Sequence, residues 1–537
     1  MTLFEKTFSR RNFLKSAVLT TLAFAATDFV DAEVFAAPKT CTAVTRHGTY
    51  NGFVGKRGVK TWLGIPYAKP PVGKLRWRAP EPLDDSTDVF DATKFGFTAM
   101  QEEDPVEPSS LHRQSEDCLT LNVWTRGRKN NLPVMVWIHG GGFVGGGTTN
   151  PIYNCENFAA AQDVVVVTLN YRVNIFGFMN FAAIDPSYED SGYLGLKDQR
   201  LALEWVRENI LSFGGDPSNI TIFGESAGAS SVMFQMILPD ANKLFHKAIA
   251  QSGTPGYCHS FDKSAKLTEK FMATGGYKDM RDIVDLPAAE LVKTYLALMN
   301  TRLIESESDY FPTADGKFLP LHPYKSLKDG AARGIKLLTG TTVDEFRYWL
   351  LYFPDMLKNI RQFHEGFISN MYEGKFLPGV DDGYRKWQKI HPEPNSLDAD
   401  EHYLEFMNQL VWRVPQELAA EYQSAFDDTF YYLFSQKSPV KNLGSCHSID
   451  LPFVFGLGDK ELDPKPSAKL IKQVQSAWAT FAATGNPSNP LIPTWRKYSV
   501  DDRQTMEINA AACVCHKDLN SDNLAALRYL YEDNLLG

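Results

Sequence analysis

The residues best placed to do chemistry lie in segment 224–228, which reads GESAG and fits the pattern G-x-S-x-G. In this pattern a serine stands on a tight turn between a strand and a helix, where glycines avoid collisions that larger residues would make with neighbouring backbone. The apolar run Ile220 to Phe223 precedes the motif, and a helix-compatible stretch, Ala229 to Leu238, follows it. We therefore predict that Ser226 is a nucleophile held at a strand-to-helix turn.

A second glycine-rich segment, His139 to Phe143 (HGGGF), comes directly after the apolar run Pro133 to Ile138. Its glycines leave backbone N–H groups free to point at a substrate oxygen. Together with the N–H of Ala227, they would stabilise the negative charge that develops as a carbonyl carbon becomes tetrahedral, by ~3 kcal/mol per donor. His139 precedes the serine, whereas the expected order is serine, acid and then histidine, so we interpret His139 as structural.

A nucleophilic serine of this kind needs a general base later in the chain. Five histidines lie far enough along the chain to serve: His364, His391, His402, His447 and His516. The first three sit in helical-looking stretches or in a polar loop. His447 instead follows the buried-looking run Phe430 to Phe434 through a short loop, so it can reach the carboxyl edge of a sheet. His447 is the favoured base, and His516 stays open as an alternative.

The acid that orients the base has two candidates, Asp344 and Glu345. Both follow the strand-like segment Ile335 to Leu338 and the turn at Gly340. A carboxylate at this place would hold the imidazole in one tautomer. Spacing alone does not choose between the two.

The elements that must position these residues alternate between strand and helix. Four apolar or aromatic runs suit strands buried on both faces: Pro133 to Ile138, Val164 to Leu169, Ile220 to Phe223 and Phe430 to Phe434. Leu196, Leu203, Val206 and Ile210 repeat at helical spacing between the second and third runs, and the glycines and proline of Phe213 to Pro217 end that helix. This order indicates a βαβ unit in a mainly parallel sheet with helices on both faces.

Composition limits the class of protein. The 55 basic and 64 acidic side chains are interspersed and give a formal net charge of -9, which argues against a nucleic-acid partner. No repeat or linker separates independent domains, so we predict one catalytic domain. The stretches Lys263 to Met299 and Trp349 to Gln423 show helical periodicity, and we expect them to be insertions that roof the active site and shape its specificity.

The first residues suggest export. Ser9 to Lys15 contains the paired arginines Arg10 and Arg11, and the modest apolar stretch Ser16 to Ala26 follows, with small residues around Ala37. This pattern is typical of a bacterial twin-arginine signal peptide, here residues 1–37. The apolar run is far shorter than the ~20 residues of a membrane span. We therefore expect a periplasmic or secreted enzyme without a stable membrane span.

Six segments carry a family resemblance: Gly64 to Ala68 (GIPYA), Ser115 to Asn122 (SEDCLTLN), Leu201 to Gly228, Asp315 to Pro320, Gly340 to Glu345 and His447 to Gly456. In order and spacing they resemble the type-B carboxylesterase family, which includes the cholinesterases. The resemblance runs from about residue 42 to the last helix. It implies an α/β-hydrolase fold for a single catalytic domain, residues 38–537. It also points to Glu345 as the triad acid and to His447 as the base.

The resemblance implies further roles around the triad. It assigns the oxyanion hole to Gly141, Gly142 and Ala227. It also implies that Arg76 pairs with Glu116 and that Ser252 and Glu225 support the triad from outside it.

The chain also departs from the family. The family usually has glycine after the triad acid and after the base, where this chain has Phe346 and Ser448. Cys118 lacks the nearby upstream partner of the family's first disulfide, so we predict that this bridge is absent. The segment Met100 to Gln114 contains no tryptophan, and the aromatic wall that cation-binding cholinesterases place there is missing. Choline esters are therefore not the expected substrates.

The sequence thus predicts a carboxylic-ester hydrolase that forms an acyl-enzyme on Ser226 and acts on a small-molecule ester. No metal or organic cofactor is needed, and Cys513, Cys515 and His516 fall short of the four ligands of a structural zinc site. One alternative is a hydrolase of amides, carbamates or lactones with the same triad. Another is a non-catalytic binding or adhesion protein, which would not react with a fluorophosphonate label at Ser226. Nothing in the sequence sets the oligomeric state.

Overall fold

The computed structural model describes residues 39–102, 113–127, 129–300, 311–371, 377–392 and 399–535. The predicted signal segment, residues 1–37, lies outside these ranges, as do residues 103–112 of the segment Met100 to Gln114. All described residues belong to one compact unit, Lys39–Gly537.

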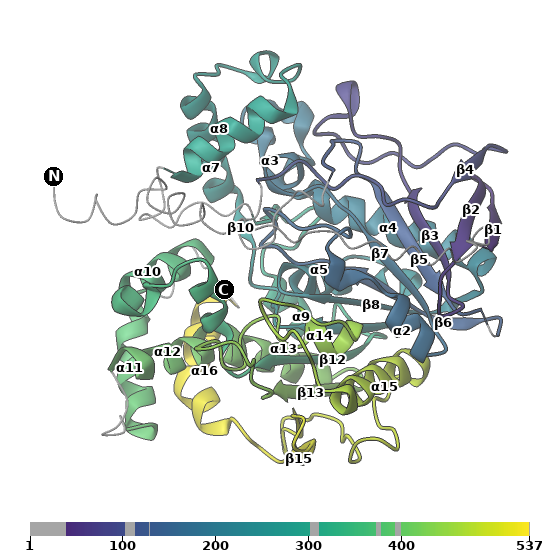
Figure 1. The fold of residues 1–537 in the computed structure, drawn as a ribbon. Coiled ribbons are helices and arrows are strands. Elements are labelled where there is room, and N and C mark those ends of the chain that lie inside the picture. Colours follow the sequence, from purple (N-terminus) through teal and green to yellow (C-terminus); the bar gives the residue numbers. More distant parts are fainter. Residues whose placement is uncertain are drawn as a thin grey trace, which may run out of the picture. The chain divides into compact units, whose positions relative to one another are not determined.

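A thirteen-stranded mixed sheet forms the centre of this unit, and a two-stranded sheet, β10-β11, accompanies it among the described residues. The order of the large sheet is β1-β2-β3-β5-β7-β6-β8-β9-β12-β13-β14-β15, with β4 beside β2 (Figure 1). The strands from β7 to β14 in this order are parallel, and antiparallel strands extend the sheet at both ends. The strand bounds are β1 Thr40–Thr45, β2 Gly48–Val54, β3 Lys60–Pro66, β4 Val89–Asp91, β5 Thr120–Thr125, β6 Leu132–Ile138, β7 Val165–Leu169, β8 Gly215–Glu225, β9 Lys247–Gln251, β10 His259–Ser260, β11 Thr313–Ala314, β12 Lys336–Thr342, β13 Thr429–Phe434, β14 Thr505–Ile508 and β15 Val514–His516.

The central strands are apolar along their length because both faces of the sheet are covered. In β6, Val134 and Val136 enter one hydrophobic core, whereas Met135 and Trp137 enter the other. A strand with polar residues on one face would bury them beneath helices, which explains the continuous apolar runs. The four predicted strands are confirmed as β6, β7, β8 and β13, although β8 begins earlier than expected and includes Pro217.

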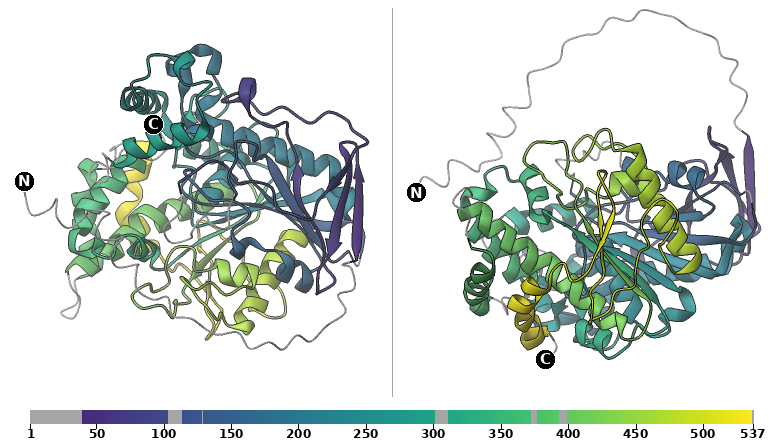
Figure 2. Two further views of the ribbon diagram at one scale, coloured as in Figure 1. Left: turned by 45° about the horizontal axis from the view of Figure 1, so that its top comes forward. Right: turned by 90° about the horizontal axis from the view of Figure 1, so that it is seen from below.

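Helices pack on both faces of the sheet (Figures 1 and 2). Apolar residues of α4 and α5 belong to one core, and those of α2, α14 and α15 belong to the other. The predicted amphipathic helix is α4, and it leads into a short 3-10 helix that ends at Gly214 with a left-handed φ of 89°. The helix bounds are α2 Glu156–Ala161, α3 Asn174–Phe178, α4 Leu194–Asn209, α5 Ala227–Ile237, α6 Ala241–Leu244, α7 Phe261–Gly275, α8 Ala288–Asn300, α9 Pro323–Lys328, α10 Ile360–Met371, α11 Leu377–Ile390, α12 Ala399–Met407, α13 Val414–Ser424, α14 Leu451–Phe455, α15 Ala468–Thr484 and α16 Ser521–Leu535.

The two predicted insertions are helical. The first contains α7 and α8, and the second contains α10 to α13 and begins within the last turn of the 3-10 helix η10 (Glu345–Leu351). The second also contains a π-helix, η12 (Asn408–Arg413), which lies between α12 and α13. Figure 1 shows α10, α11 and α12 grouped beside α16. Within the described ranges, we find no helix of the length and hydropathy that crossing a membrane would require.

Candidate active site

Ser226 stands on the turn between β8 and α5, with φ 59° and ψ -126°. A left-handed φ is strained for a serine, and such strain is common at functional turns. A Cβ atom on Gly224 would lie 2.6 Å from the backbone of Gly228, and one on Gly228 would lie 2.1 Å from the carbonyl oxygen of Ile138. Both glycines are therefore required. From residue 220 to residue 238, Ser226 is the only residue that is not fully buried.

The glycine loop after β6 lies against this turn. A Cβ atom on Gly140 would lie 3.1 Å from the Cβ of Ser226. The next two residues, Gly141 and Gly142, are exposed and have φ values of 110° and 60°. Ala227 is the first residue of α5, so its N–H has no acceptor within the helix. The three residues predicted for the oxyanion hole thus lie on two segments that meet beside Ser226.

His139, at the start of the same loop, is packed rather than presented to the site. Its ring stacks on Tyr171 with 4.3 Å between centroids, and its Nδ1 lies 2.8 Å from the carbonyl oxygen of Gly140. The hydroxyl of Tyr171 donates to the carbonyl oxygen of His139 at 2.9 Å. These contacts agree with the structural role expected for His139.

His447 and Glu345 form a buried pair beyond the carboxyl ends of β13 and β12. The Nδ1 atom of His447 lies 2.6 Å from Oε2 of Glu345, which is fully buried. The other carboxylate oxygen, Oε1, accepts hydrogen bonds from the hydroxyl of Ser252 at 2.7 Å and from the backbone N–H of Thr342 at 2.8 Å. These two donors fix the carboxylate so that Oε2 faces the imidazole.

The residues left open as alternatives lie elsewhere. Asp344 accepts a hydrogen bond from the backbone N–H of Ser445 at 2.8 Å, and it faces Arg347 instead of His447. His516 lies on β15, the last strand of the sheet, and its Nε2 is 2.9 Å from Oε2 of Glu507. In the structure Glu345 contacts His447, whereas the side chain of neither Asp344 nor His516 contacts this pair.

The second nitrogen of His447 faces a different carboxylate. Its Nε2 lies 3.0 Å from Oε1 of Glu225, the residue before Ser226. The contact is not aligned as a hydrogen bond, and Nε2 has no aligned partner among the described residues. Among the residues that the structure describes, the hydroxyl of Ser226 forms no hydrogen bond with His447.

Buried carboxyl groups set the electrostatics around His447. Burial lowers the pKa of His447, but the carboxylates of Glu225 and Glu345 outweigh this effect and raise its pKa to about 10. Burial also raises the pKa of Asp450 to about 7, and the nearby charge of Glu225 adds to this effect. The surrounding carboxylates therefore favour the charged form of the imidazole, the form that results when Nε2 takes up a proton.

Sequence reasoning missed Asp450 and the aromatic residues around His447. Oδ2 of Asp450 accepts hydrogen bonds from the side chains of Gln251 at 2.8 Å and Tyr432 at 3.2 Å. Rings near His447 lie at centroid distances of 4.6 Å for Trp412 and 5.4 Å for Trp349. The position of Asp450, three residues after the base, was a usable signal, whereas the π-helix that carries Trp412 leaves none in the hydrophobic pattern.

Phe346, the residue after Glu345, where the resemblance leads us to expect glycine, is buried in this aromatic group. Its ring centroid lies 5.6 Å from that of Trp349 and 6.3 Å from that of Trp412. Its backbone N–H donates to Oδ1 of Asn408, on the π-helix, at 2.9 Å. The substitution therefore ties the residue after Glu345 to the second insertion.

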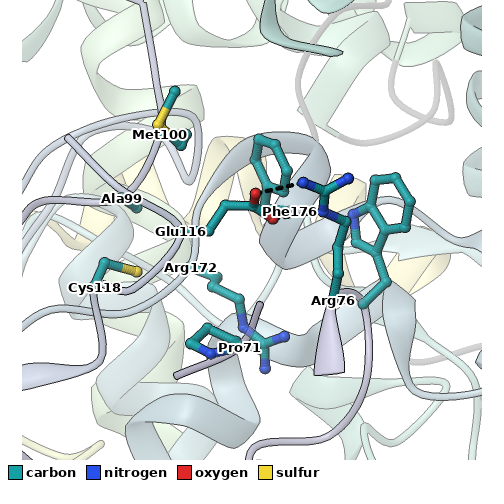
Figure 3. Close-up of a pocket in the computed structure, with 9 residues that line it drawn as sticks. Pro71, Arg76, Ala99, Met100, Glu116, Cys118, Arg172 and Phe176 are labelled. Atoms are coloured by element: carbon teal, nitrogen blue, oxygen red, sulfur yellow. Dashed lines mark hydrogen bonds and ion pairs between the residues drawn. The ribbon is translucent and has the colours of Figure 1, made fainter. Parts of the chain in front are cut away.

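A separate cavity of about 10 Å³ lies away from the triad residues (Figure 3). Arg76 crosses it to form two hydrogen bonds with Glu116, at 2.6 and 2.5 Å, which is the pairing that the resemblance implied. Cys118 also lines it as a buried free thiol. A cavity of this size holds about one water molecule, so it is no substrate site. Its lining residues are Pro71, Arg76, Trp77, Ala99, Met100, Glu116, Cys118, Arg172 and Phe176.

Comparison with known proteins identifies the family. Residues 41–527 match the model of the Carboxylesterase family. The chain is 38% identical over 484 residues to the para-nitrobenzyl esterase of Bacillus subtilis (strain 168), covering 87% of this chain and 94% of the relative. It is 30% identical over 499 residues to the phenmedipham hydrolase of Pseudarthrobacter oxydans, covering 88% of this chain and 96% of the relative.

A solved structure described as a "thermophylic PNB esterase" superimposes with a TM-score of 0.78 at 35% identity, covering 90% of this chain and 99% of that one. The similarity confirms the α/β-hydrolase fold that the sequence predicts. Family, fold and relatives agree on one class of reaction. The chain belongs to the carboxylesterase family and is a carboxylic-ester hydrolase.

Proposed function

We propose that the chain hydrolyses small-molecule carboxylic esters with Ser226 as nucleophile, His447 as general base and Glu345 as the acid that orients the base. The 2.6 Å contact between Nδ1 of His447 and Oε2 of Glu345 is the observation that supports this most directly. Glu225 connects the pair to the serine turn, because it precedes Ser226 and lies 3.0 Å from the other imidazole nitrogen.

In the first step the Ser226 oxygen attacks the ester carbonyl carbon and its proton passes to Nε2 of His447. Backbone N–H groups of Gly141, Gly142 and Ala227 stabilise the resulting oxyanion. When the tetrahedral intermediate collapses, the bond to the alcohol oxygen breaks and Nε2 returns the proton to that oxygen. Water then attacks the acyl-serine and gives a proton to the same nitrogen. When this second intermediate collapses, the bond to the Ser226 oxygen breaks, Nε2 returns the proton to that oxygen, and the acid is released.

Glu345 acts through the other side of the ring. Because its Oε2 accepts the Nδ1 proton, the neutral imidazole keeps Nε2 unprotonated and ready to accept from Ser226. Ser252 and Thr342 hold the carboxylate in place during the reaction. The same carboxylate stabilises the imidazolium that forms in each half-reaction.

The aromatic residues around His447 favour esters with an apolar or aromatic group next to the scissile bond. Trp349 and Tyr348 are partly exposed, and their ring centroids lie 5.4 and 5.8 Å from that of the imidazole, whereas Trp412, at 4.6 Å, is buried behind it. Ring surfaces of this kind stack on flat apolar groups. The name of the para-nitrobenzyl esterase, a 38% identical relative, points to the same substrate type.

Hydrolysis of a p-nitrophenyl ester series of increasing acyl length tests the proposal. We expect Ser226→Ala to lower kcat by a factor on the order of 10⁶ while the protein stays folded. Ser218→Ala, which removes an exposed hydroxyl from the same strand, is the matched control and should keep full activity. Ester hydrolysis that survives in Ser226→Ala, or absence of fluorophosphonate labelling at Ser226 in the wild type, would contradict the proposed nucleophile.

We further propose that residues 1–37 are a twin-arginine export signal and that the enzyme works in the periplasm or outside the cell. Paired arginines and the short apolar stretch support this, and the family match begins only at residue 41. Replacing Arg10 and Arg11 by lysine should retain the protein in the cytoplasm of a bacterial host. Unchanged export of the double variant would rule out this route.

A further inference from the structure

Ser448, the residue after the proposed base, has an unusual backbone and a directed side chain. It is buried, with a left-handed φ of 67°, a conformation that favours glycine. The family usually has glycine here. The hydroxyl of Ser448 donates a hydrogen bond to Oε1 of Glu225 at 2.7 Å. A side chain kept at a position suited to glycine indicates a task for its hydroxyl.

The acceptor of this hydrogen bond is the oxygen that faces His447. Oε1 of Glu225 lies 2.7 Å from the Ser448 hydroxyl and 3.0 Å from Nε2 of His447. Nε2 is the nitrogen that exchanges protons with Ser226 and with the leaving group in the proposed mechanism. The three side chains are almost fully buried, so water does not screen their interaction.

We propose that Ser448 is a positioning residue: its hydroxyl fixes Glu225 beside His447 and weakens the hold of that carboxylate on the proton of the imidazolium. The inference deepens the proposed function and rests on the proposed roles of Ser226 and His447.

The physical argument concerns one shared oxygen. A carboxylate oxygen that accepts a strong hydrogen bond has less electron density to offer a second donor. Without the Ser448 hydroxyl, Oε1 of Glu225 would attract the Nε2 proton more strongly. The imidazolium would then persist to higher pH, and the neutral base that accepts the serine proton would be rarer at neutral pH.

Other titratable groups face the same pair and must be considered in any pH experiment. Glu225 and Glu345 are the charges that act most strongly on His447. The remaining groups come from three other places: Tyr348 from η10, Asp450 and Cys446 from the segment around the base, and Tyr432 from β13. Because burial raises the pKa of Asp450 to about 7, its titration overlaps the range of interest.

The test is the pH dependence of kcat/KM on a p-nitrophenyl ester, measured in the full-length enzyme. Ser448→Ala and Ser448→Gly should both move the acid limb of the profile to higher pH, which lowers kcat/KM at pH values below the limb by about threefold to tenfold. Glu225→Gln should move the limb to lower pH. In the double variant Ser448→Ala, Glu225→Gln, the acid limb should lie at the same pH as in Glu225→Gln alone. Repeating the two pH profiles in an Asp450→Asn background removes the overlapping titration of Asp450.

The two serine variants separate the hydroxyl from the backbone. Glycine relieves the left-handed conformation, so Ser448→Gly should melt at a higher temperature than Ser448→Ala, while the two share one pH shift. No shift, a shift to lower pH, or a shift that persists in Glu225→Gln would overturn the inference. Activity that survives Ser226→Ala would instead sink the proposed triad, so the two failures are distinguishable.

Discussion

Two buried histidines in this protein occupy opposite electrostatic environments. His447 lies between the carboxylates of Glu225 and Glu345, which outweigh burial and raise its pKa to about 10. His364, a residue of α10 that contacts Tyr403 of α12, is also buried, but burial and the nearby charge of Arg361 lower its pKa to about 3. Burial is thus common to both, and the partners decide whether the ring carries a charge.

The contacts of His364 fit a neutral ring. Its Nδ1 lies 2.7 Å from the hydroxyl of Tyr403, and its Nε2 has no hydrogen-bond partner among the described residues. The guanidinium of Arg361 lies over the ring of Tyr403, 4.2 Å from its centroid. The surroundings of His447 therefore favour the charged imidazole, whereas those of His364 favour the neutral ring. Single substitutions at or beside each histidine can therefore test the two environments independently.

The largest expected effect comes from Glu345→Gln. An amide here presents N–H or C=O to Nδ1 and no charge to the imidazolium, so we expect kcat to fall by a factor on the order of 10⁴. Asp344→Asn is the matched control, because Asp344 is the neighbouring acid and does not contact His447. It should change kcat less than about tenfold. Steady-state kinetics on one ester decides, and equal losses in both variants would contradict the assignment of the acid.

His447→Gln should change how the free energy of unfolding depends on pH. Since the pKa of His447 is raised, the wild type gains stability as pH falls from about 10 toward 6.5, by up to about 1.4 kcal/mol per pH unit. This gain is fully present below pH 6.5 and is lost as pH rises through 10. Denaturant melts of the variant should therefore show a smaller pH slope between 7 and 10. If the variant kept the wild-type pH dependence of unfolding between pH 7 and 10, the group that binds the proton would not be His447.

His364 should affect the pH dependence of stability in the opposite direction, which His364→Asn tests. Because the pKa of His364 is lowered to about 3, unfolding becomes easier as pH falls from about 6.5 toward 3, by up to about 1.4 kcal/mol per pH unit. Asparagine keeps an acceptor near the position of Nδ1 but binds no proton in this range. The variant should resist acid unfolding better than the wild type, as measured by circular dichroism at pH 4 and 5. Equal pH midpoints of acid unfolding for the variant and the wild type would show that protonation of His364 does not contribute to acid unfolding.

The smallest effect is expected for Arg361→Gln. Removing this charge should raise the pKa of His364 toward its usual value and reduce the acid slope only in part, because burial is the larger cause. Loss of the guanidinium from the rings of Tyr384 and Tyr403 should cost about 0.5–1 kcal/mol at every pH. Unfolding at pH 5 and pH 8 separates the two contributions, and an acid slope equal to that of the wild type would exclude the charge effect.

Local chemistry explains what the sequence could predict. Gly224 and Gly228 are neighbours of Ser226 in the chain, so the turn was readable from five residues. The apolar strands were readable because both faces of each are covered. Gly215 to Pro217 suggested a turn, and although β8 begins at Gly215, its pairing with β6 passes from Gly215 directly to Ile220. Asp216 lies in the unpaired part and accepts a hydrogen bond from the backbone N–H of Ser218 at 2.8 Å, so the local turn preference is expressed there.

Long-range contacts explain what was missed. Position in the chain favoured His447 without excluding His516, whereas spacing left Asp344 and Glu345 undecided until the family resemblance favoured Glu345. Asp450 is held by Gln251, 199 positions away in the chain, and no local pattern encodes such a partner. The hydroxyl of Ser448 is likewise defined by Glu225, 223 positions earlier.

The π-helix Asn408–Arg413 couples the length of the chain to the orientation of its parts. A π-turn spends about one residue more than an α-turn, and each residue of an α-helix rotates the chain by about 100°. Deleting one residue here would restore a regular helix and turn α12, with everything attached to it, around the axis of α13. A change of length in a loop outside the continuous segment from α12 to α13 would leave this rotation unchanged. The number of residues in the π-helix therefore sets how α12 is rotated relative to α13, and this segment also places the ring of Trp412 4.6 Å from that of His447.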